Sequence, residues 1–191
     1  MTAMLDRRAA MAVLLRDPGD LLVVSGLGST TYDAGAVGDR AENFYLWGAM
    51  GGAAMIGLGL ALAQPARRVL VVTGDGEMLM GLGSLATIAA APAPNLAIAV
   101  MDNGRYGETG AQASHTALGT DLAAVAAGCG WGATCTVSDE AGLAALASRL
   151  RREPLFAVVR IAPAETPRFL PPRDGAFLQH RFRAALGIDE A

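Results

Sequence analysis

The chain alternates short apolar runs with longer segments in which apolar residues recur every three or four positions. Two of these runs, Val69–Thr73 and Leu96–Met101, have the length and the apolar character of buried strands. Polar clusters follow them directly, Gly74-Asp75-Gly76 after the first run and Asp102-Asn103-Gly104 after the second. If the two strands are parallel neighbours, both clusters lie at the carboxyl edge of one sheet, where open α/β folds bind ligands.

The same alternation along the rest of the chain predicts an α/β fold: a doubly wound, mostly parallel sheet with helices on both faces. Further strands are predicted at Leu21–Ser25, Asn43–Trp47, Ala133–Val137 and Leu155–Ile161. Helices are predicted at Thr2–Arg16, in a segment ending near Ala63, at Met78–Ala90, at Asp121–Gly128, from a Ser138 cap to Arg151, and at Ala176–Leu186. A long polar loop is predicted at Gly104–Thr120. We expect residues 1–191 to form one domain, in which 162–191 supply a crossing segment and a terminal helix.

The side chains of the two clusters suit a magnesium ion and a diphosphate. Asp75 offers an anionic oxygen and Asn103 a neutral amide oxygen, and Mg²⁺ takes about six oxygens, only one or two of them from carboxylates. Gly74 and Gly76 allow a ligand to approach the backbone closely. A helix starting near Glu77 would direct free N–H groups at a phosphate. The residues therefore predict a diphosphate–Mg²⁺ site.

Composition narrows the class of protein. Apolar residues make up 52% of the chain and charged residues 17%, which is typical of a well-packed α/β domain and not of a disordered chain. The net charge of −3 and the lack of a basic block argue against nucleic-acid binding. Cys129 and Cys135 form no CxxC motif, so a reduced cytoplasmic compartment is expected. The uncharged Gly48–Ala63 stretch is shorter than the roughly 20 residues of a membrane span, and no signal peptide or membrane association is expected.

Asn103, in the second cluster, follows Asp75 by 28 residues. The two clusters at this spacing resemble the fingerprint of thiamine diphosphate (ThDP)-dependent enzymes. The resemblance covers about Leu21 to Ile161 and implies the diphosphate-binding (PP) domain of that family. It implies three metal ligands: Asp75, Asn103 and the main-chain carbonyl of Arg105. It also implies that ThDP and Mg²⁺ are the cofactors. The expected cofactor-binding residues are Gly48, Met50, Gly74, Asp75, Gly76, Glu77, Asn103, Arg105 and Tyr106.

The Gly48-Ala49-Met50-Gly51 segment resembles the pyrimidine-binding turn of the decarboxylase branch of this family. By that resemblance Met50 supports the bent shape of ThDP, and the Gly48 carbonyl accepts a hydrogen bond from the 4′-amino group of ThDP. Together with the GDGxxLMxLGSLATI segment and the Gly107–Gln112 loop, it points to the sulfopyruvate and phosphonopyruvate decarboxylases. The implied reaction is loss of CO₂ from a 2-oxo acid, with ThDP as the electron sink.

The family also requires a glutamate from a pyrimidine-binding (PYR) domain, and Glu42, Glu108, Glu140 and Glu153 lie in unsuitable turn, loop or helix-end positions. We therefore expect a separate PYR (α) subunit to supply this glutamate, in an α₂β₂ or larger assembly. Within the glycine-rich loop, His115 is the candidate catalytic residue, because it could orient an anionic substrate or relay a proton. Arg105 could face a sulfonate or phosphonate.

Other classes of protein remain open at the level of sequence. A carboligase subunit resembling acetolactate synthase would carry the same cofactor motifs, and a PP-domain scaffold without catalysis is a further alternative. Gly26 and Gly28 give half of a dinucleotide fingerprint, but Thr31 stands where the third glycine belongs. Two cysteines cannot ligate the iron–sulfur clusters of a pyruvate:ferredoxin oxidoreductase.

Overall fold

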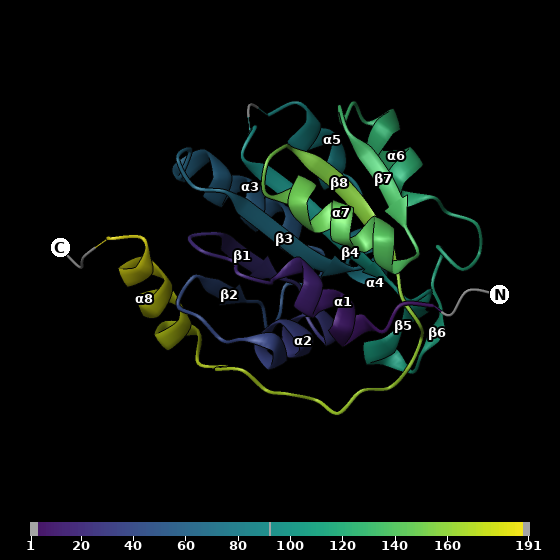
Figure 1. Cartoon of the computed structure of the whole chain (residues 1–191), viewed down its shortest axis with the longest axis horizontal. Coiled ribbons are helices and arrows are strands. Elements are labelled where there is room, and N and C mark those ends of the chain that lie inside the picture. The colour runs from purple at the N-terminus through teal and green to yellow at the C-terminus, as the bar shows by residue number, and fades with distance from the viewer. Residues whose placement is uncertain (1–3, 92, 189–191) are drawn as a thin grey trace.

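Six strands form one sheet in which every pairing is parallel (Figure 1). The structure is a computed structural model that describes residues 4–91 and 93–188. The strands are β1 Leu22–Ser25, β2 Asn43–Tyr45, β3 Val69–Gly74, β4 Leu96–Asp102, β7 Thr134–Val137 and β8 Leu155–Arg160, in the spatial order β2-β1-β3-β4-β8-β7. The predicted doubly wound parallel sheet is confirmed.

The central strands β3 and β4 are buried on both faces, which is why they contain almost no polar residues. Their register pairs Thr73 with Val100 and Gly74 with Met101. Since the strands are parallel and in register, the polar clusters that follow them meet at one edge, as the sequence predicted.

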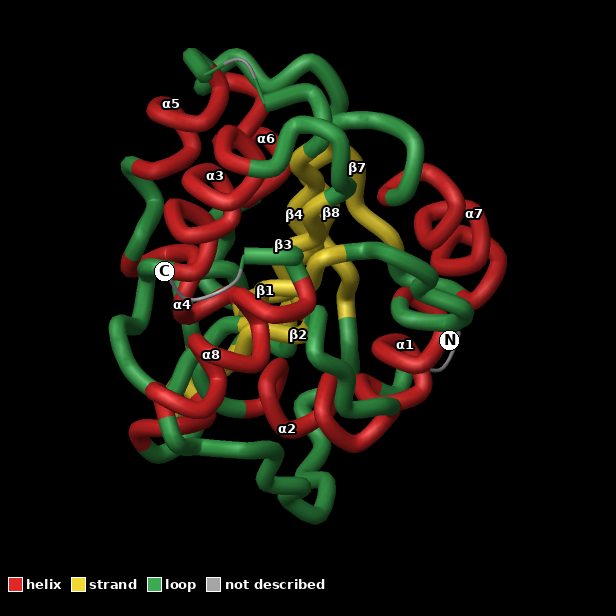
Figure 2. The backbone as a smooth tube through the Cα atoms, turned by 90° about the vertical axis from the view of Figure 1, so that its left-hand side faces the viewer, coloured by secondary structure: helices red, strands yellow, loops and turns green. Residues whose placement is uncertain are grey.

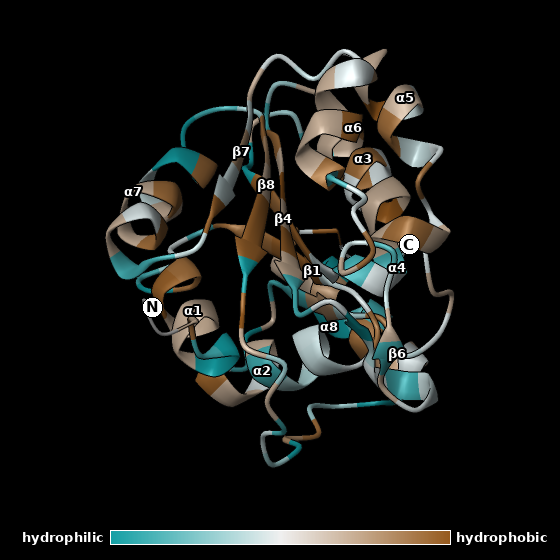
Figure 3. Cartoon of the chain, turned by 90° about the vertical axis from the view of Figure 1, so that its right-hand side faces the viewer, coloured by the Kyte–Doolittle hydropathy of each residue, from teal (hydrophilic) through white to brown (hydrophobic). Residues whose placement is uncertain are grey.

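Helices cover both faces of the sheet (Figure 2). The α-helices are α1 Arg7–Leu14, α2 Ser29–Val37, α3 Ala53–Ala63, α4 Asp75–Met80, α5 Ser84–Ala89, α6 Leu122–Gly128, α7 Glu140–Leu150 and α8 Gly175–Ala185. Apolar residues of α1, α2 and α7 pack on one face, and those of α3, α5 and α6 pack on the other. Figure 3 shows the apolar residues concentrated in the strands between these layers.

Three of the predicted helix boundaries are wrong. The Met78–Ala90 helix is two helices, because α4 ends at Met80 and α5 begins at Ser84. At the break, a Cβ on Gly81 would lie 2.2 Å from the Gly51 carbonyl oxygen, so two backbones pack closely there. The N-cap of α7 is Asp139 rather than Ser138, and its carboxylate accepts from the N–H of Gly142 at 2.7 Å. The first helix starts at Arg7, although its predicted start at Thr2 lies outside the described residues.

Two elements were missing from the prediction. Helix α2 is poor in helix-forming residues, but its threonine hydroxyls bond inward, and both Thr30 and Thr31 donate to the Gly26 carbonyl. The loop at 104–120 contains a small hairpin, β5 Arg105–Tyr106 and β6 Gln112–Ala113, with a 3₁₀ turn η1 Gly107–Thr109 between them. Both elements line the carboxyl edge of the sheet.

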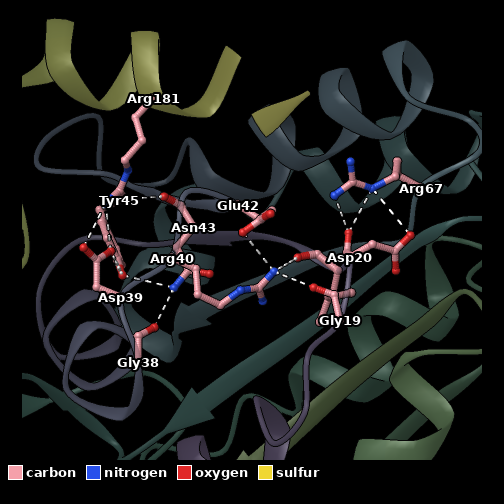
Figure 4. A network of polar contacts seen from close by, with 11 residues as sticks. Gly19, Asp20, Gly38, Asp39, Arg40, Glu42, Asn43, Tyr45, Arg67 and Arg181 are labelled. Atoms are coloured by element: carbon pink, nitrogen blue, oxygen red, sulfur yellow. Dashed lines mark hydrogen bonds and ion pairs between the residues drawn. The ribbon is translucent and has the colours of Figure 1, made fainter. Parts of the chain in front are cut away.

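Helix α8 covers the edge strand β2 after the chain has run along the outside of α2 (Figure 1). Arg181 of α8 pairs with Asp39 at 2.8 Å and donates to the Asn43 carbonyl at 3.2 Å (Figure 4). Trp47 donates its indole N–H to the Pro172 carbonyl at 2.8 Å. Covering an edge strand in this way protects it from pairing with another chain.

Candidate functional site

A cavity with an empty volume of about 770 Å³, part of it open to solvent, lies at the carboxyl edge of β3 and β4. Eight of the nine residues predicted to bind cofactor line it: Met50, Gly74, Asp75, Gly76, Glu77, Asn103, Arg105 and Tyr106. The ninth, Gly48, is exposed and is not among the lining residues. The structure therefore brings together two clusters and one turn that are far apart in the sequence.

Asp75 is a buried carboxylate with only 2% of its surface exposed. Ser114 donates to its Oδ2 at 2.5 Å, and the Thr116 hydroxyl oxygen lies 3.2 Å from the same atom. Burial is the largest effect and raises the pKa of Asp75, the Ser114 hydrogen bond lowers it, and the nearby Asp102 raises it. No ion pair joins Asp75 to an arginine in the described part of the chain. A buried carboxylate that lines a cavity without a cationic partner fits a divalent cation.

Asp102 is equally buried, but an arginine balances its charge. Arg160 pairs with its Oδ2 at 2.7 Å, while Thr116 and the N–H of Gly104 donate to its Oδ1 at 2.8 and 3.0 Å. It does not line the cavity. Thr116 therefore bridges the two aspartates and fixes the end of β4 against the end of β3.

Asn103 lies half-buried at the turn into the hairpin, and its Oδ1 accepts from the N–H of Arg105 at 2.8 Å. An amide oxygen has two lone pairs, so this bond leaves one available to a metal ion. The Arg105 guanidinium is exposed, and among the described residues its hydrogen-bond acceptor is the Ala111 carbonyl, at 3.4 Å. Asp75, Asn103 and Arg105 thus lie on one cavity with donor chemistry suited to Mg²⁺.

The two glycines of the first cluster differ in their surroundings. A Cβ added at Gly76 would lie 2.7 Å from the Tyr106 ring, so this glycine makes room for a protein side chain. A Cβ at Gly74 would meet nothing within 4 Å. Close approach of a ligand is therefore open at Gly74, whereas at Gly76 the space belongs to Tyr106.

Glu77 belongs to the first turn of α4, which begins at Asp75 rather than near Met78. It is 3% exposed, and Thr73 donates to its Oε2 at 2.8 Å. Burial is the main effect that raises its pKa, and the Thr73 hydrogen bond lowers it. Gly26 has no Cβ where this carboxylate packs, since an added Cβ would overlap Oε2. Glu77 thus joins the ends of β1 and β3 beneath the cavity.

His115 is exposed and is not among the cavity-lining residues. Its Nδ1 shares a hydrogen bond of 2.7 Å with the Tyr106 hydroxyl, and the two rings meet edge to face with centroids 6.1 Å apart. Since Tyr106 lines the cavity, His115 contacts the site through that side chain.

The sequence prediction missed one side of the cavity. Ser29 and Thr30, at the start of α2, line it together with Arg7 of α1. The available signal was a strand followed by Gly26-Leu27-Gly28-Ser29-Thr30, which indicated a glycine turn but not the helix after it. Arg7 gave no signal at all, because its partners are more than 20 residues away.

The fold and the cavity are those of a cofactor-binding α/β domain, and comparison with known proteins gives the family. Residues 28–161 match the model of the thiamine pyrophosphate enzyme, C-terminal TPP binding domain. The chain therefore belongs to the thiamine pyrophosphate enzyme family, and the resemblance seen in the sequence is confirmed.

Similar sequences include two groups of named decarboxylases. The chain is 47% identical over 137 residues to a phosphonopyruvate decarboxylase of Streptomyces viridochromogenes, an alignment that covers 70% of this chain and 34% of that protein. It is 44% identical over 119 residues to a sulfopyruvate decarboxylase subunit beta of Methanocaldococcus jannaschii, covering 62% of this chain and 63% of that protein. The chain thus spans about a third of the first relative and somewhat under two thirds of the second.

A solved structure shares the fold. The X-ray structure of a candidate thiamin diphosphate-dependent enzyme isolated from Mycobacterium smegmatis matches with a TM-score of 0.71 at 27% identity. The match covers 85% of this chain and 33% of that one.

Within residues 4–91 and 93–188, no group of three or more acidic, histidine or cysteine side chains is placed to hold a metal ion. The oxygens of Asp75, Asn103 and the Arg105 main chain form no such group, because only one of them belongs to an acidic side chain. None of the described helices is long and apolar enough to cross a membrane.

Proposed function

We propose that this chain is the PP (β) subunit of a two-chain, ThDP- and Mg²⁺-dependent decarboxylase that acts on a 2-oxo acid. The main support is the cavity, where Asp75 is buried without a cation and faces the same space as Asn103. Family membership supplies the cofactor, and the named relatives supply the reaction class.

In this proposal the oxygens of Asp75 and Asn103 and the main-chain carbonyl of Arg105 hold Mg²⁺. The N–H groups that begin α2 and α4 bind the diphosphate, since free helix N-termini favour anions. Met50 lines the cavity beside them and supports the cofactor from the apolar side, and Gly48 offers its carbonyl. When bound, ThDP supplies the electron sink that makes loss of CO₂ feasible.

A separate PYR (α) subunit supplies the catalytic glutamate. Glu77 is engaged by Thr73 beneath the cavity, and Glu108 is exposed on the hairpin loop. Helix α3 supports a partner because its outer side carries exposed Met55, Ile56 and Leu62 without any charge. Three relatives are named subunit beta of sulfopyruvate decarboxylase. The proposed assembly is α₂β₂ or larger.

The proposed substrate is a 2-oxo acid resembling sulfopyruvate or phosphonopyruvate, after the names of the relatives. Arg105 supplies an exposed cation near the cavity mouth, and His115 is proposed to orient this anion or to move a proton with Tyr106. We assign the enzyme to the cytoplasm because Cys129 and Cys135 are both free thiols.

The test is to co-express the chain with the protein encoded beside it and to measure CO₂ release with ThDP and Mg²⁺. The substrates are sulfopyruvate, phosphonopyruvate, pyruvate and benzoylformate. We expect activity only when both chains are present. CO₂ release that yields an acetolactate-like carboligation product in place of the free aldehyde would contradict the decarboxylase and favour a ligase. Absence of ThDP binding in the pair would overturn the proposal as a whole.

A further inference from the structure

One end of the cavity is formed by a helix outside the segment that matches the family. Arg7 is the first residue of α1 and precedes residues 28–161. It lines the main cavity, and also an adjoining hollow that shares Ser29, Asn103 and Glu108 with it. Helix α1 is therefore part of the cavity wall.

Arg7 is placed against the ordinary preferences of its residue type. Its exposed fraction is only 7%, and so deeply buried an arginine needs an ionic partner, which Asp33 provides. It also lies in the first turn of a helix, where the helix dipole disfavours cations. Such violations of local preference are typical of functional sites.

The contacts of Arg7 hold its guanidinium toward the start of α2. Its Nε lies 3.1 Å from Asp33 Oδ2, and its Nη1 donates to Ser29 Oγ at 2.6 Å. Arg8 pairs with the other oxygen of Asp33, also at 3.1 Å. One carboxylate thus faces two guanidinium groups, so Asp33 alone does not balance both positive charges.

The hydrogen bond from Arg7 orients the Ser29 hydroxyl as a donor to a further acceptor. The Ser29 oxygen accepts from Arg7, so its own proton remains available to another acceptor. Ser29 is the first residue of α2, whose N-cap Gly28 provides no side-chain cap. The carboxylate of Glu108 packs against Gly28, where an added Cβ would lie 2.5 Å from Oε1. This end of the cavity therefore already accommodates an anionic oxygen.

We propose that Arg7 and Ser29 form an anion subsite for the terminal phosphate of the diphosphate, contributed in part by a helix outside the family domain. This inference rests on the proposed function, because the anion is the ThDP diphosphate. Arg7 strengthens the subsite by its charge and by fixing the Ser29 hydroxyl. Charge-assisted hydrogen bonds of this kind are about twice as strong as neutral ones.

Arg8 provides a matched control, because it pairs with the same Asp33 but points elsewhere. Its Nη2 donates to the Pro167 carbonyl at 2.7 Å, and it does not line the cavity. Arg7→Met and Arg8→Met each remove one guanidinium from Asp33. Only Arg7→Met removes a group from the proposed subsite.

The experiment is isothermal titration of the full chain, purified together with its partner subunit, with Mg²⁺ and either ThDP or thiamine monophosphate. We expect Arg7→Met to weaken ThDP binding by about 10- to 100-fold and to leave thiamine monophosphate binding nearly unchanged. Ser29→Ala is expected to act in the same direction with a smaller effect, and Arg7→Lys to restore part of the loss. Arg8→Met should leave the ratio of the two dissociation constants as in the wild type.

Equal weakening of both ligands by Arg7→Met would indicate a structural effect and overturn the inference. A wild-type ratio of the two dissociation constants in Arg7→Met would also overturn the inference. If Arg7→Met does not fold, the same result in both Ser29→Ala and Arg7→Lys would overturn it. Circular dichroism and the melting temperature establish whether each variant is folded. If the wild type itself binds no ThDP, the proposed function fails, which is a different result from loss of discrimination.

Discussion

The two edges of the parallel sheet handle their charged groups in opposite ways. At the amino edge, arginines and one asparagine donate hydrogen bonds to backbone carbonyls. Arg68 donates to the carbonyls of Pro94, Leu150 and Glu153 at 2.7–2.9 Å. The Asn95 amide shares its two protons among three carbonyls at 2.8–3.0 Å, one in the last turn of α3 (Ala61) and two after it (Gln64 and Arg67). Figure 4 shows Arg40 and Arg67 also bonded to backbone carbonyls, of Gly19 and Asp20, and in addition paired with the carboxylates of Glu42 and Asp20.

At the carboxyl edge, the buried charges of Asp75 and Arg7 are less completely partnered, although Asp102 is paired with Arg160. Asp75 has hydroxyl donors but no arginine within the described residues, and Arg7 and Arg8 share a single aspartate. An uncompensated buried charge costs stability. The amino edge is therefore complete as a folded structure, whereas under the proposed function the carboxyl edge would become complete on binding Mg²⁺ and diphosphate.

The largest expected effect is that of Asp75→Asn, which keeps the shape of the side chain and removes its charge. A unit charge 4 Å away contributes about 4 kcal/mol at an effective dielectric of 20, which corresponds to roughly a thousand-fold in affinity. We expect Mg²⁺-dependent ThDP binding to be lost in titration calorimetry, and activity with it. The melting temperature of the cofactor-free chain should not fall, because a buried charge is removed.

Ser114→Ala is the control for this prediction. It removes a donor to Asp75 and keeps the carboxylate, so binding should weaken by no more than about 10-fold. Tight Mg²⁺–ThDP binding by Asp75→Asn would contradict the metal assignment and make the two edges of the sheet alike.

The next effect is that of His115→Asn. If His115 moves a proton or orients the substrate, kcat should fall by about 100-fold, which is within the range of general acid–base catalysis. ThDP affinity should stay as in the wild type, because His115 does not line the cavity. Tyr106→Phe removes the other partner of the 2.7 Å hydrogen bond and serves as the comparison. Wild-type kcat in His115→Asn would remove this residue from the mechanism.

Asp102→Asn tests the satisfied aspartate of the carboxyl edge. It loses the charge that pairs with Arg160, whose side chain is 37% exposed, so the cost in unfolding free energy should be about 2 kcal/mol. ThDP affinity should fall less than in Asp75→Asn, since Asp102 acts through the position of Asn103. Chemical denaturation and titration on one preparation measure both quantities. A loss of affinity as large as that of Asp75→Asn, without a loss of stability, would make Asp102 a ligand.

The smallest effect on the site is expected at the amino edge. Arg68→Met leaves three carbonyls without their donor and should lower the unfolding free energy by about 2 kcal/mol, or the melting temperature by roughly 4–8 °C. ThDP affinity and kcat below the melting range should be unchanged. Reduced ThDP affinity in this folded variant would show that the two edges are coupled.

Much of the fold was predictable because its signals are local. Buried strands such as β3 and β4 are continuous apolar runs, and the glycine and aspartate clusters that end them are adjacent in sequence. Parallel pairing then places Asp75 and Asn103 on one edge. Helix α2 and the break at Gly81 were not predictable, since one depends on inward threonine hydrogen bonds and the other on contact with the Gly51 backbone.

By itself, the sequence determined the parallel sheet, the two polar strand ends and the family, because each depends on residue types at short spacing. Only the tertiary structure decided which charges at the site are satisfied. Ser114 reaches Asp75 across 39 positions, and Arg7 reaches Ser29 across 22. Such bonds depend on where distant segments meet in space, which residue spacing does not encode. Partners of this kind set the charge balance of the cavity, and therefore what it can bind.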